Sequence, residues 1–271
     1  LRVGDVRDGS LVRRALEGVE AVIHLAAQTG VIPSQQDPGG DFDVNAHATF
    51  ELLAASRDAG IRKFVFASTG GAILGEKRPP IHEEMPARPL SPYGASKLAG
   101  EGYCSAFFGS FGLPTVSLRF SNVYGPYSYH KGSVIARFFK LLLEGRPLTV
   151  YGDGTQTRDF LYVEDLVDAV LLALEAAPGG EVFQIASGQE TSINQLIALL
   201  GEVVPDHPIN VEYAPARRGE VSRNFASIDK ARRVLNFHPR VPLREGLGKT
   251  WEWFWQRRTS GIAQALRSHA S

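Results

Sequence analysis

The first half of this 271-residue chain alternates short apolar runs with segments that have the spacing of an amphipathic helix. Apolar runs occur at residues 19–27, 63–68 and 114–120, and helical spacing occurs at residues 41–60 and 91–112. A strand inside a parallel sheet is buried on both faces, so its sequence is a continuous apolar run and not an alternating one. Strands and helices in this order predict an α/β fold with a doubly wound parallel sheet that helices cover on both faces.

The second half is less regular, and proline and glycine become denser between Gly125 and Pro215. Shorter patterns there predict five further elements, which are helices over 132–144, 163–176 and 192–204 and strands over 148–151 and 182–186. This change in composition predicts that a smaller, loop-rich domain follows the α/β domain.

Charge and cysteine content exclude several classes of function. Lysine plus arginine equals aspartate plus glutamate at 29 each, so neither a nucleic acid nor an acidic membrane is an expected partner. The single cysteine, Cys104, is expected to be a small buried residue and fits a reducing cytoplasm. No apolar run approaches the roughly 18 residues of a membrane helix. The histidines lack metal-ligand spacing, so we expect a cytoplasmic protein without a metal site.

The strongest chemical signal is Tyr93-Gly-Ala-Ser-Lys97, because tyrosine and lysine four residues apart lie on one face of a helix. A free phenol has a pKa of about 10, and a neighbouring ammonium group lowers that pKa by favouring the phenolate. The pair is therefore a candidate for a base that removes a proton from a hydroxyl group. The same spacing is common by chance, so an exposed pair on a helix surface is the alternative.

Thr69 follows the apolar run at 63–68 and precedes Tyr93 by about 20 residues. Parallel α/β sheets bind ligands at the carboxyl ends of their strands, which is where this hydroxyl is expected. Thr69 could relay a proton to Tyr93, although the neighbouring Ser68 offers the same group. The alternative is a loop hydroxyl that caps the backbone.

Further motifs occur along the chain in a fixed order, namely Gly4-Asp5-Val6-Arg7-Asp8, His24-Leu25-Ala26-Ala27, Asn45, Arg119-Phe-Ser-Asn122-Val-Tyr-Gly-Pro126 and Arg158-Asp-Phe-Leu-Tyr-Val-Glu-Asp165. With them, residues 1–245 resemble the extended short-chain dehydrogenase/reductase family, and within it the nucleotide-sugar 4-epimerases. Each motif is weak alone, but the set is specific. The resemblance implies a Rossmann-like sheet and NAD as cofactor, with NAD chosen over NADP on the family alone.

The resemblance also implies roles for individual residues. The catalytic residues would be Thr69, Tyr93 and Lys97. The residues expected to contact the cofactor are Asp5, Val6, Leu25, Ala26, Ala27, Gln28, Asn45, Tyr93, Lys97 and Ser121. The residues expected to contact the substrate are Thr69, Asn122, Val134, Tyr151, Arg158, Arg217, Glu220 and Asn224. Arg158 and Arg217 would face the substrate diphosphate, because guanidinium groups suit phosphate oxygens.

The domain boundaries follow from the same resemblance. We expect an NAD-binding domain over 1–126 to which 155–187 returns, a nucleotide-sugar domain mainly over 127–258, and a frayed polar tail over 259–271. Family resemblance further implies a homodimer that packs through the two long helices of the first domain.

The chain departs from the family at its beginning. A dinucleotide fold opens with a glycine-rich loop that lets the pyrophosphate approach a helix N-terminus, and no such loop is present. Gly70, Gly71 and Gly75 follow a strand, but Lys77 to Pro80 come where a helix should open. We therefore expect the chain to begin at the third strand of the fold. A non-catalytic fragment that binds nucleotide sugars is one alternative function.

The residues after Thr69 bear on the reaction. Related 4,6-dehydratases have Asp-Glu there, and related decarboxylases and uronate epimerases have Glu, whereas this chain has Gly70-Gly71. The resemblance thus implies 4-epimerisation of UDP-glucose and UDP-galactose, with another NAD-dependent dehydratase or decarboxylase as the alternative. Leu74 replaces a tyrosine of the relatives and cannot donate a hydrogen bond, so we expect different contacts to the hexose. Asn224 is small where the family limits bulk at C2 of the sugar, which extends the expectation to the N-acetylhexosamine pair.

Overall fold

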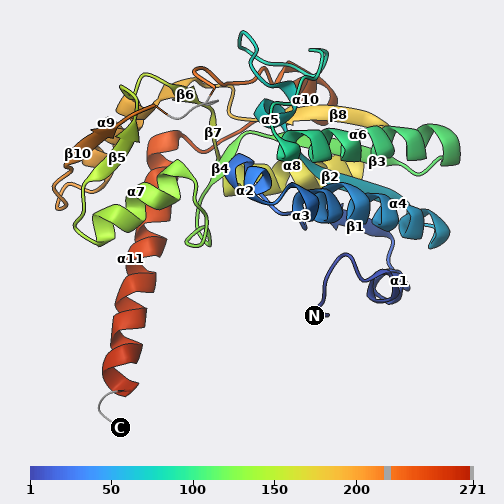
Figure 1. Cartoon of the computed structure of the whole chain (residues 1–271), viewed down its shortest axis with the longest axis horizontal. Helices are drawn as coiled ribbons and strands as arrows, with labels where there is room; N and C mark the ends of the chain where they lie inside the picture. The colour runs from blue at the N-terminus through green and yellow to red at the C-terminus, as the bar shows by residue number, and fades with distance from the viewer. Residues whose placement is uncertain (217–220, 269–271) are drawn as a thin grey trace. The chain divides into compact units, whose positions relative to one another are not determined.

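The computed structural model describes residues 1–216 and 221–268, with side chains described as far as residue 258 (Figure 1). The chain divides into two compact units. Unit 1 comprises Leu1–Ser121, Val167–Gly188 and Ala226–His238, and unit 2 comprises Asn122–Leu166, Gln189–Phe225 and Pro239–Ser271.

A four-stranded sheet forms the centre of unit 1. Its strands are β1 (Ala21–His24), β2 (Lys63–Thr69), β3 (Thr115–Phe120) and β8 (Glu181–Ile185), in the order β1-β2-β3-β8. Each strand is parallel to its neighbour. All four carboxyl ends therefore meet at one edge, and the predicted α/β fold with a parallel sheet is confirmed.

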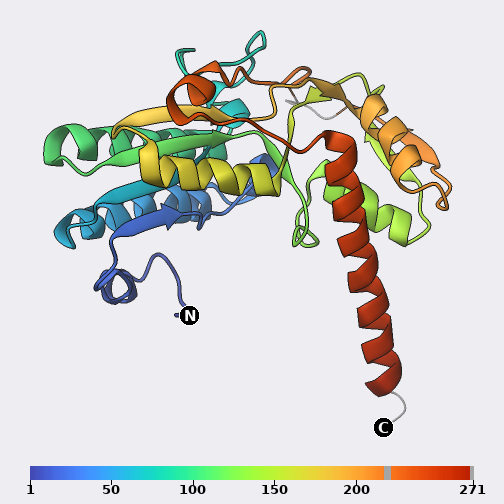
Figure 2. The ribbon, with the colours of Figure 1, turned by 180° about the vertical axis from the view of Figure 1, so that it is seen from behind.

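The helices of unit 1 cover both faces of this sheet. They are α1 (Gly9–Leu16), α2 (Val31–Gln36), α3 (Pro38–Phe42), the π-helix η1 (Asp43–His47), α4 (Ala48–Asp58), α5 (Gly70–Leu74), α6 (Pro92–Phe111) and α10 (Asp229–Leu235). Helix α8 (Val163–Ala176) begins in unit 2 and belongs to unit 1 from Val167 on. Seen from behind, α8 lies on the opposite face of the sheet from α4 and α6 (Figure 2).

The signals in the sequence explain the bounds of α6. Ser91 caps the helix by accepting a hydrogen bond from the backbone nitrogen of Gly94 at 3.2 Å, and Pro92 occupies the first turn. Gly112 ends the helix in the left-handed conformation, with φ of 70°. Gly100 lies directly against the ring of Phe66, so a side chain there would push the helix away from β2. This close approach brings Lys97, one turn earlier, to the same strand.

The described residues of unit 2 form three two-stranded sheets and three helices, besides the first turn of α8. The strand pairs are β4 (Asn122–Tyr124) with β7 (Phe160–Tyr162), β5 (Leu148–Tyr151) with β10 (Val211–Ala214), and β6 (Thr157–Arg158) with β9 (Thr191–Ser192). The helices are α7 (Val134–Leu143), α9 (Ile193–Val203) and α11 (Leu243–Ser268). Their apolar faces form a second core around Phe138, Phe139, Leu196 and Phe254. The structure thus has the irregular second half that the sequence predicts.

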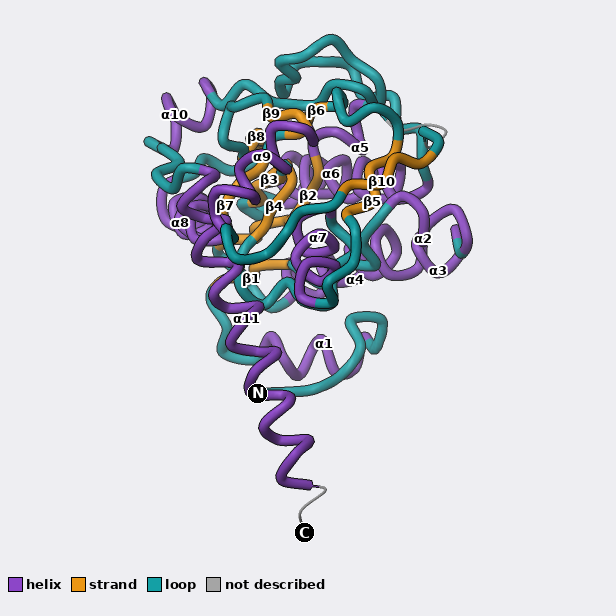
Figure 3. The backbone as a smooth tube through the Cα atoms, turned by 90° about the vertical axis from the view of Figure 1, so that its left-hand side faces the viewer, coloured by secondary structure: helices purple, strands orange, loops and turns teal. Residues whose placement is uncertain are grey.

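The structure differs from the sequence-based expectations in four places. The returning segment starts at Val167 where the sequence analysis placed it at 155, and Ala226–His238 also joins unit 1, where Lys230 pairs with Glu181 of β8 at 2.7 Å. The expected frayed tail from 259 is wrong as far as Ser268, because α11 is continuous to that residue (Figure 3). A helix does open after Thr69, although α5 has only five residues.

Candidate active site

Helix α6 places Tyr93 and Lys97 on consecutive turns. Lys97 is 2% exposed, and its Nζ donates a hydrogen bond to the backbone oxygen of Ala67 at 2.9 Å. The same ammonium group lies 4.8 Å from the centre of the Phe66 ring. Both contacts tie Lys97 to the carboxyl half of β2, so the alternative of an exposed surface pair is wrong.

Burial governs the protonation of this pair. Burial first, and the nearby carboxylate of Asp41 second, raise the pKa of Tyr93 to about 12. Burial also lowers the pKa of Lys97 to about 8, against the opposing effect of Asp41. In the protein by itself the pKa of Tyr93 is therefore raised and not lowered, because burial and a neighbouring negative charge both penalise the phenolate.

The two hydroxyl groups at the end of β2 have different surroundings. Ser68 is buried and donates a hydrogen bond to Oε1 of Glu101 at 2.6 Å. Thr69 is half-buried, and in the described chain its side chain makes no capping hydrogen bond to α5, which begins at the next residue. Ser68 is therefore committed to the protein interior, and Thr69 is the better placed of the two for a ligand.

A buried ion pair fixes α6 to the sheet one turn beyond Lys97. The guanidinium of Arg119 on β3 binds both carboxylate oxygens of Glu101, with its closest contact at 2.7 Å. Only 7% of the Arg119 side chain and 5% of the Glu101 side chain are exposed. Because Glu101 also accepts from Ser68, this carboxylate joins α6, β2 and β3 next to the candidate site.

The loop after β1 contains several of the residues predicted to contact a cofactor. Asn45 is buried and binds both backbone groups of Gln28, accepting from its nitrogen at 2.9 Å and donating to its oxygen at 2.8 Å. Leu25 is 60% exposed, Ala26 is exposed and Ala27 is half-buried. A rigid loop with exposed apolar groups at a strand's carboxyl end suits a flat organic ligand.

The other predicted cofactor residues lie at both ends of unit 1's first segment. The hydroxyl of Ser121 is buried and has no hydrogen-bond partner within the described chain. Arg7 donates to the Asp5 carboxylate from its backbone nitrogen at 2.9 Å and from its guanidinium at 2.6 Å, which lowers the pKa of Asp5 to about 2. Val6 packs against the core. Ser121 therefore has a donor to offer a ligand, whereas the Asp5 carboxylate is already engaged.

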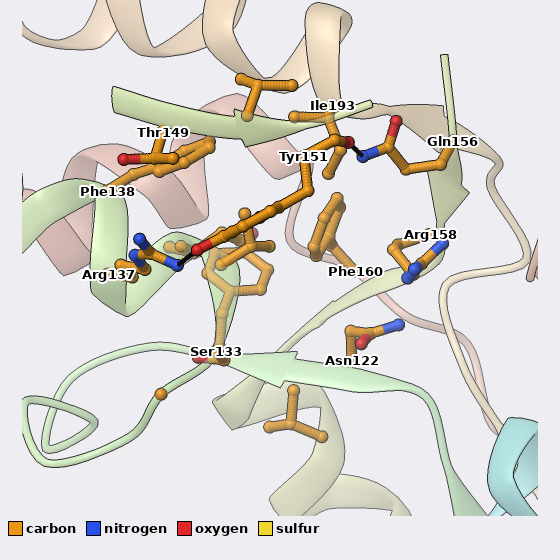
Figure 4. Close-up of a pocket in the computed structure, with 16 residues that line it drawn as sticks. Asn122, Ser133, Arg137, Phe138, Thr149, Tyr151, Gln156, Arg158, Phe160 and Ile193 are labelled. Atoms are coloured by element: carbon orange, nitrogen blue, oxygen red, sulfur yellow. Dashed lines mark hydrogen bonds between the residues drawn. The ribbon is translucent and has the colours of Figure 1, made fainter. Parts of the chain in front are cut away.

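Unit 2 contains a cavity of about 190 Å³ (Figure 4). Four residues predicted to contact the substrate line it, and these are Asn122, Val134, Tyr151 and Arg158. One water molecule occupies roughly 30 Å³, so the cavity holds about six waters, or one heterocyclic ring with some space around it.

Several polar residues of this cavity, among them Arg137, Gln156 and Ser133, were not predicted from the sequence. Arg137 donates to the hydroxyl of Tyr151 at 3.2 Å, and Gln156 donates to the backbone oxygen of Tyr151 at 2.7 Å (Figure 4). Ser133, at the start of α7, has a buried hydroxyl with no partner in the described chain. The available signal was Arg137 itself, an arginine within the otherwise apolar stretch Val134–Phe139.

Arg158 enters the same cavity from β6. Its Nη1 donates to the backbone oxygens of Thr157 at 2.7 Å and of Val221 at 2.9 Å. Arg217 and Glu220, which were also predicted to contact the substrate, lie outside the described residues. Asn224 is half-buried, and its neighbour Arg223 binds Glu190 through two hydrogen bonds of 2.7 Å. The segment that carries Asn224 is thus held to unit 2 by an ion pair.

Within the residues that the structure describes, no helix is both long enough and apolar enough to cross a membrane. No three histidine, cysteine, aspartate or glutamate side chains of this part of the chain gather in a way that could hold a metal ion.

The proteins that resemble this chain belong to one family. Residues 1–186 match the NAD dependent epimerase/dehydratase family. The UDP-glucose 4-epimerase of Mycolicibacterium smegmatis is 41% identical over 240 residues, which cover 87% of this chain and 76% of that protein. The human dTDP-D-glucose 4,6-dehydratase is 34% identical over 259 residues, which cover 93% and 72%.

A solved structure extends the match to three dimensions. The crystal structure of the Thermotoga maritima UDP-glucose 4-epimerase with UDP-glucose superimposes with a TM-score of 0.89 at 38% identity, and the match covers 94% of this chain and 84% of that one. Sequence and fold therefore agree, and the chain belongs to the NAD-dependent epimerase/dehydratase family.

Proposed function

We propose that the protein is a UDP-hexose 4-epimerase that interconverts UDP-glucose and UDP-galactose with NAD as cofactor. The observation that carries the proposal is the buried turn of α6, in which Lys97 is anchored to β2 one helical turn from Tyr93. Burying a lysine costs free energy unless its charge is paired or functional, and here Lys97 donates its hydrogen bond to a neutral carbonyl.

In this proposal Tyr93 takes the proton of the sugar's 4-hydroxyl group, either directly or through Thr69. Its raised pKa means that Tyr93 keeps its proton in the protein alone. A positive charge brought close to Tyr93 lowers that pKa toward the working range, because an opposite charge stabilises the phenolate. Lys97 orients the cofactor ribose and adds to the positive charge. The chemistry that bound NAD supplies is the reversible oxidation of C4.

The described residues fit the nicotinamide side of such a cofactor. The buried hydroxyl of Ser121 offers a donor that is otherwise unpaired in the described chain, and the exposed Leu25 and Ala26 offer a flat apolar surface. Asn45 would hold the Gln28 backbone in place for the same ligand. These residues would bind the ribose and nicotinamide portions.

The cavity of unit 2 would receive the nucleotide portion of the substrate. At about 190 Å³ it is smaller than the 300–1,000 Å³ of pockets that enclose complete ligands, so it suits the base and not the whole UDP-sugar. Arg158 would reach the diphosphate, for which the geometry of its guanidinium group is suited.

The end of β2 supports epimerisation over dehydration. A 4,6-dehydratase needs an acidic pair after the catalytic threonine, but here Gly70 follows Thr69. A Cβ atom at Gly70 would collide with the side-chain amide of Gln184. An aspartate at this position would therefore require the end of the Gln184 side chain to move.

The experiment that tests this function is product analysis. The protein is incubated with NAD and either UDP-glucose or dTDP-glucose, and the products are identified by nuclear magnetic resonance. We expect UDP-galactose from UDP-glucose and no 4-keto-6-deoxy sugar from either. A 4-keto-6-deoxy product would make the protein a dehydratase, and the absence of any turnover with a full complement of NAD would favour a binding protein.

A homodimer is part of the same proposal. Tyr103, Phe108 and Phe111 of α6 are each at least 40% exposed, and Phe50 of α4 contacts Tyr103 with ring centres 5.1 Å apart. Exposed aromatic residues along two neighbouring helices are typical of a protein interface. We expect the mass in solution, measured by light scattering, to be twice that of the chain, and to fall to one chain when Phe111 is replaced by Glu.

A further inference from the structure

Asp41 is a completely buried carboxylate that the proposed reaction does not use. It lies in α3, and its exposed fraction is 0%. A buried charge is costly unless hydrogen bonds or an opposite charge compensate it. Its contacts therefore indicate what it stabilises.

Two hydrogen bonds reach Asp41 from two different elements. Nδ2 of Asn45 donates to Oδ1 at 2.8 Å, and the hydroxyl of Ser96 donates to Oδ2 at 2.7 Å. Ser96 lies between Tyr93 and Lys97 on α6, directly before the lysine. Asn45 lies in the π-helix η1, and such local widening of a helix is frequent at functional sites. Asp41 thus links the turn of α6 that carries Tyr93 and Lys97 to Asn45, which binds the backbone of Gln28.

The network extends to β1 through one more step. The hydroxyl of Thr49 donates to the backbone oxygen of Asn45 at 2.8 Å and lies 3.0 Å from Nε2 of His24. Burial first, and the charge of Lys97 second, lower the pKa of His24 to about 4, so this imidazole is neutral near pH 7. Asp41 is therefore the charged member of a network that otherwise consists of neutral groups.

The charged groups around Asp41 and Tyr93 are few. Helices α2 and α5 carry no ionisable residue. Asp43 and His47 of η1 are both exposed, as are the charged residues of α4, which are Glu51, Arg57 and Asp58. On α6 the groups near Asp41 are Tyr93 and Lys97, and Glu101 further along is paired with Arg119 of β3. Removing the charge of Asp41 therefore changes the field at Tyr93 with little compensation from other groups.

We propose that Asp41 is a positioning residue that holds the Tyr93–Lys97 turn against the loop after β1 through its hydrogen bonds to Ser96 and Asn45. The inference rests on the proposed function, since it assumes that Tyr93 is the base. Geometry and charge make separable contributions: the two hydrogen bonds fix the turn, and the negative charge adds to burial, which is the larger cause of the raised pKa of Tyr93. The direction of the second contribution agrees with the raised pKa of Tyr93.

The test compares Asp41→Asn with Asp41→Glu across a pH profile of kcat/KM for UDP-glucose. Activity falls below the pKa of a required base, and removing a nearby negative charge lowers that pKa. We expect the acidic limb of the Asp41→Asn profile to move down by about one pH unit, at the low end of what one close charge contributes. The Asp41→Glu variant keeps the charge, so its limb should stay at the wild-type position even where its rate falls.

Ser96→Ala is the matched control, because it removes one hydrogen bond and keeps the charge. We expect it to lower kcat without moving the acidic limb. A limb that stays in place in Asp41→Asn, or that moves equally in Ser96→Ala, would overturn the electrostatic role.

A second measurement does not depend on turnover. The near-ultraviolet absorbance of tyrosinate is titrated in the wild type, in Asp41→Asn, and in each of these combined with Tyr93→Phe, so that the difference isolates Tyr93. We expect Tyr93 to ionise at lower pH in Asp41→Asn, and an unchanged titration would contradict the inference. This readout separates the two proposals: if Tyr93→Phe retains full activity, the proposed base is wrong, whereas a titration that does not move overturns only the role of Asp41.

Discussion

Lys97 and Asn45 of unit 1 are buried and held by regular elements, whereas Tyr151 and Arg158 of unit 2 are half-exposed and come from short strands. In unit 1, Lys97 and Asn45 have their polar groups bound to the backbone of the loop or strand beside them. In unit 2, Tyr151 and Arg158 line an open cavity of about 190 Å³.

This difference suggests that unit 1 carries out the proton transfer and that unit 2 recognises the substrate. A dry environment shifts protonation, as the pKa values of about 12 for Tyr93 and about 8 for Lys97 illustrate, and proton transfer needs such tuned groups. A polar cavity can exchange water for a ligand's own polar groups, which serves recognition. We therefore expect substitutions in unit 1 to affect stability and turnover, and substitutions in unit 2 to affect KM and specificity.

The largest expected effect is on stability and compares two ion pairs. Glu101→Gln leaves Arg119 buried without its charged partner, which we expect to cost about 3 kcal/mol of unfolding free energy. The matched control in unit 2 is Glu190→Gln, because 55% of the Arg223 side chain is exposed and such a pair contributes less than about 1 kcal/mol. Chemical denaturation measures the loss of unfolding free energy in each variant. Equal losses in Glu101→Gln and Glu190→Gln would contradict this prediction.

Tyr93→Phe tests the proton transfer in unit 1. Loss of the phenol removes the base, and we expect turnover to fall at least 100-fold, about the lower end of a general-base contribution. KM should change little because the substrate's nucleotide portion would bind in unit 2. Steady-state kinetics with UDP-glucose measure both values, and near-wild-type turnover would eliminate Tyr93 as the base.

Arg158→Ala tests recognition in unit 2. A hydrogen bond to a charged group contributes about 1.5–3 kcal/mol, so we expect KM for UDP-glucose to rise roughly 30-fold while kcat changes less. Circular dichroism serves as the control for folding, since Arg158 also binds the backbone of Val221. A variant that loses kcat and keeps KM would place Arg158 in the chemistry and break the division between the units.

Asn224→Tyr should have the smallest effect, confined to specificity. A small residue at this position admits an N-acetyl group at C2, so we expect the wild type to accept UDP-N-acetylglucosamine as well as UDP-glucose. The tyrosine should lower kcat/KM for the acetylated substrate by roughly tenfold relative to UDP-glucose, within the 1–3 kcal/mol that pocket size provides. An unchanged ratio would show that Asn224 does not limit the size of the sugar.

The sequence predicted the regular part of the molecule well, and the reason is physical. Parallel strands buried on both faces leave apolar runs that are easy to recognise, and Ser91, Pro92 and Gly112 mark both ends of α6. The same regularity located Tyr93 and Lys97, because a helix fixes which residues share a face. In unit 2, by contrast, strands of two to four residues carry too few positions for a periodic signal.

Other features depend on contacts between distant segments. The spacing of Tyr93 and Lys97 suggested a lowered pKa for the tyrosine, and the structure reverses the direction because burial and Asp41 act on it. Asp41 gave no signal in the sequence, since its partner Ser96 lies 55 residues further along the chain, on α6. Arg137 was missed for a similar reason, because its partner Tyr151 lies on a different element.

The most direct test of the account follows the hydrogen atom at C4 of the sugar. UDP-glucose that carries deuterium at C4 is converted in ordinary water with NAD present, and the position of the label in the product is read by nuclear magnetic resonance. Reversible oxidation at C4 in a site closed to solvent predicts UDP-galactose that retains the deuterium at C4, and Tyr93→Phe should give almost no labelled product. Loss of the deuterium to solvent, or a labelled product whose configuration at C4 is unchanged, would contradict 4-epimerisation by this site.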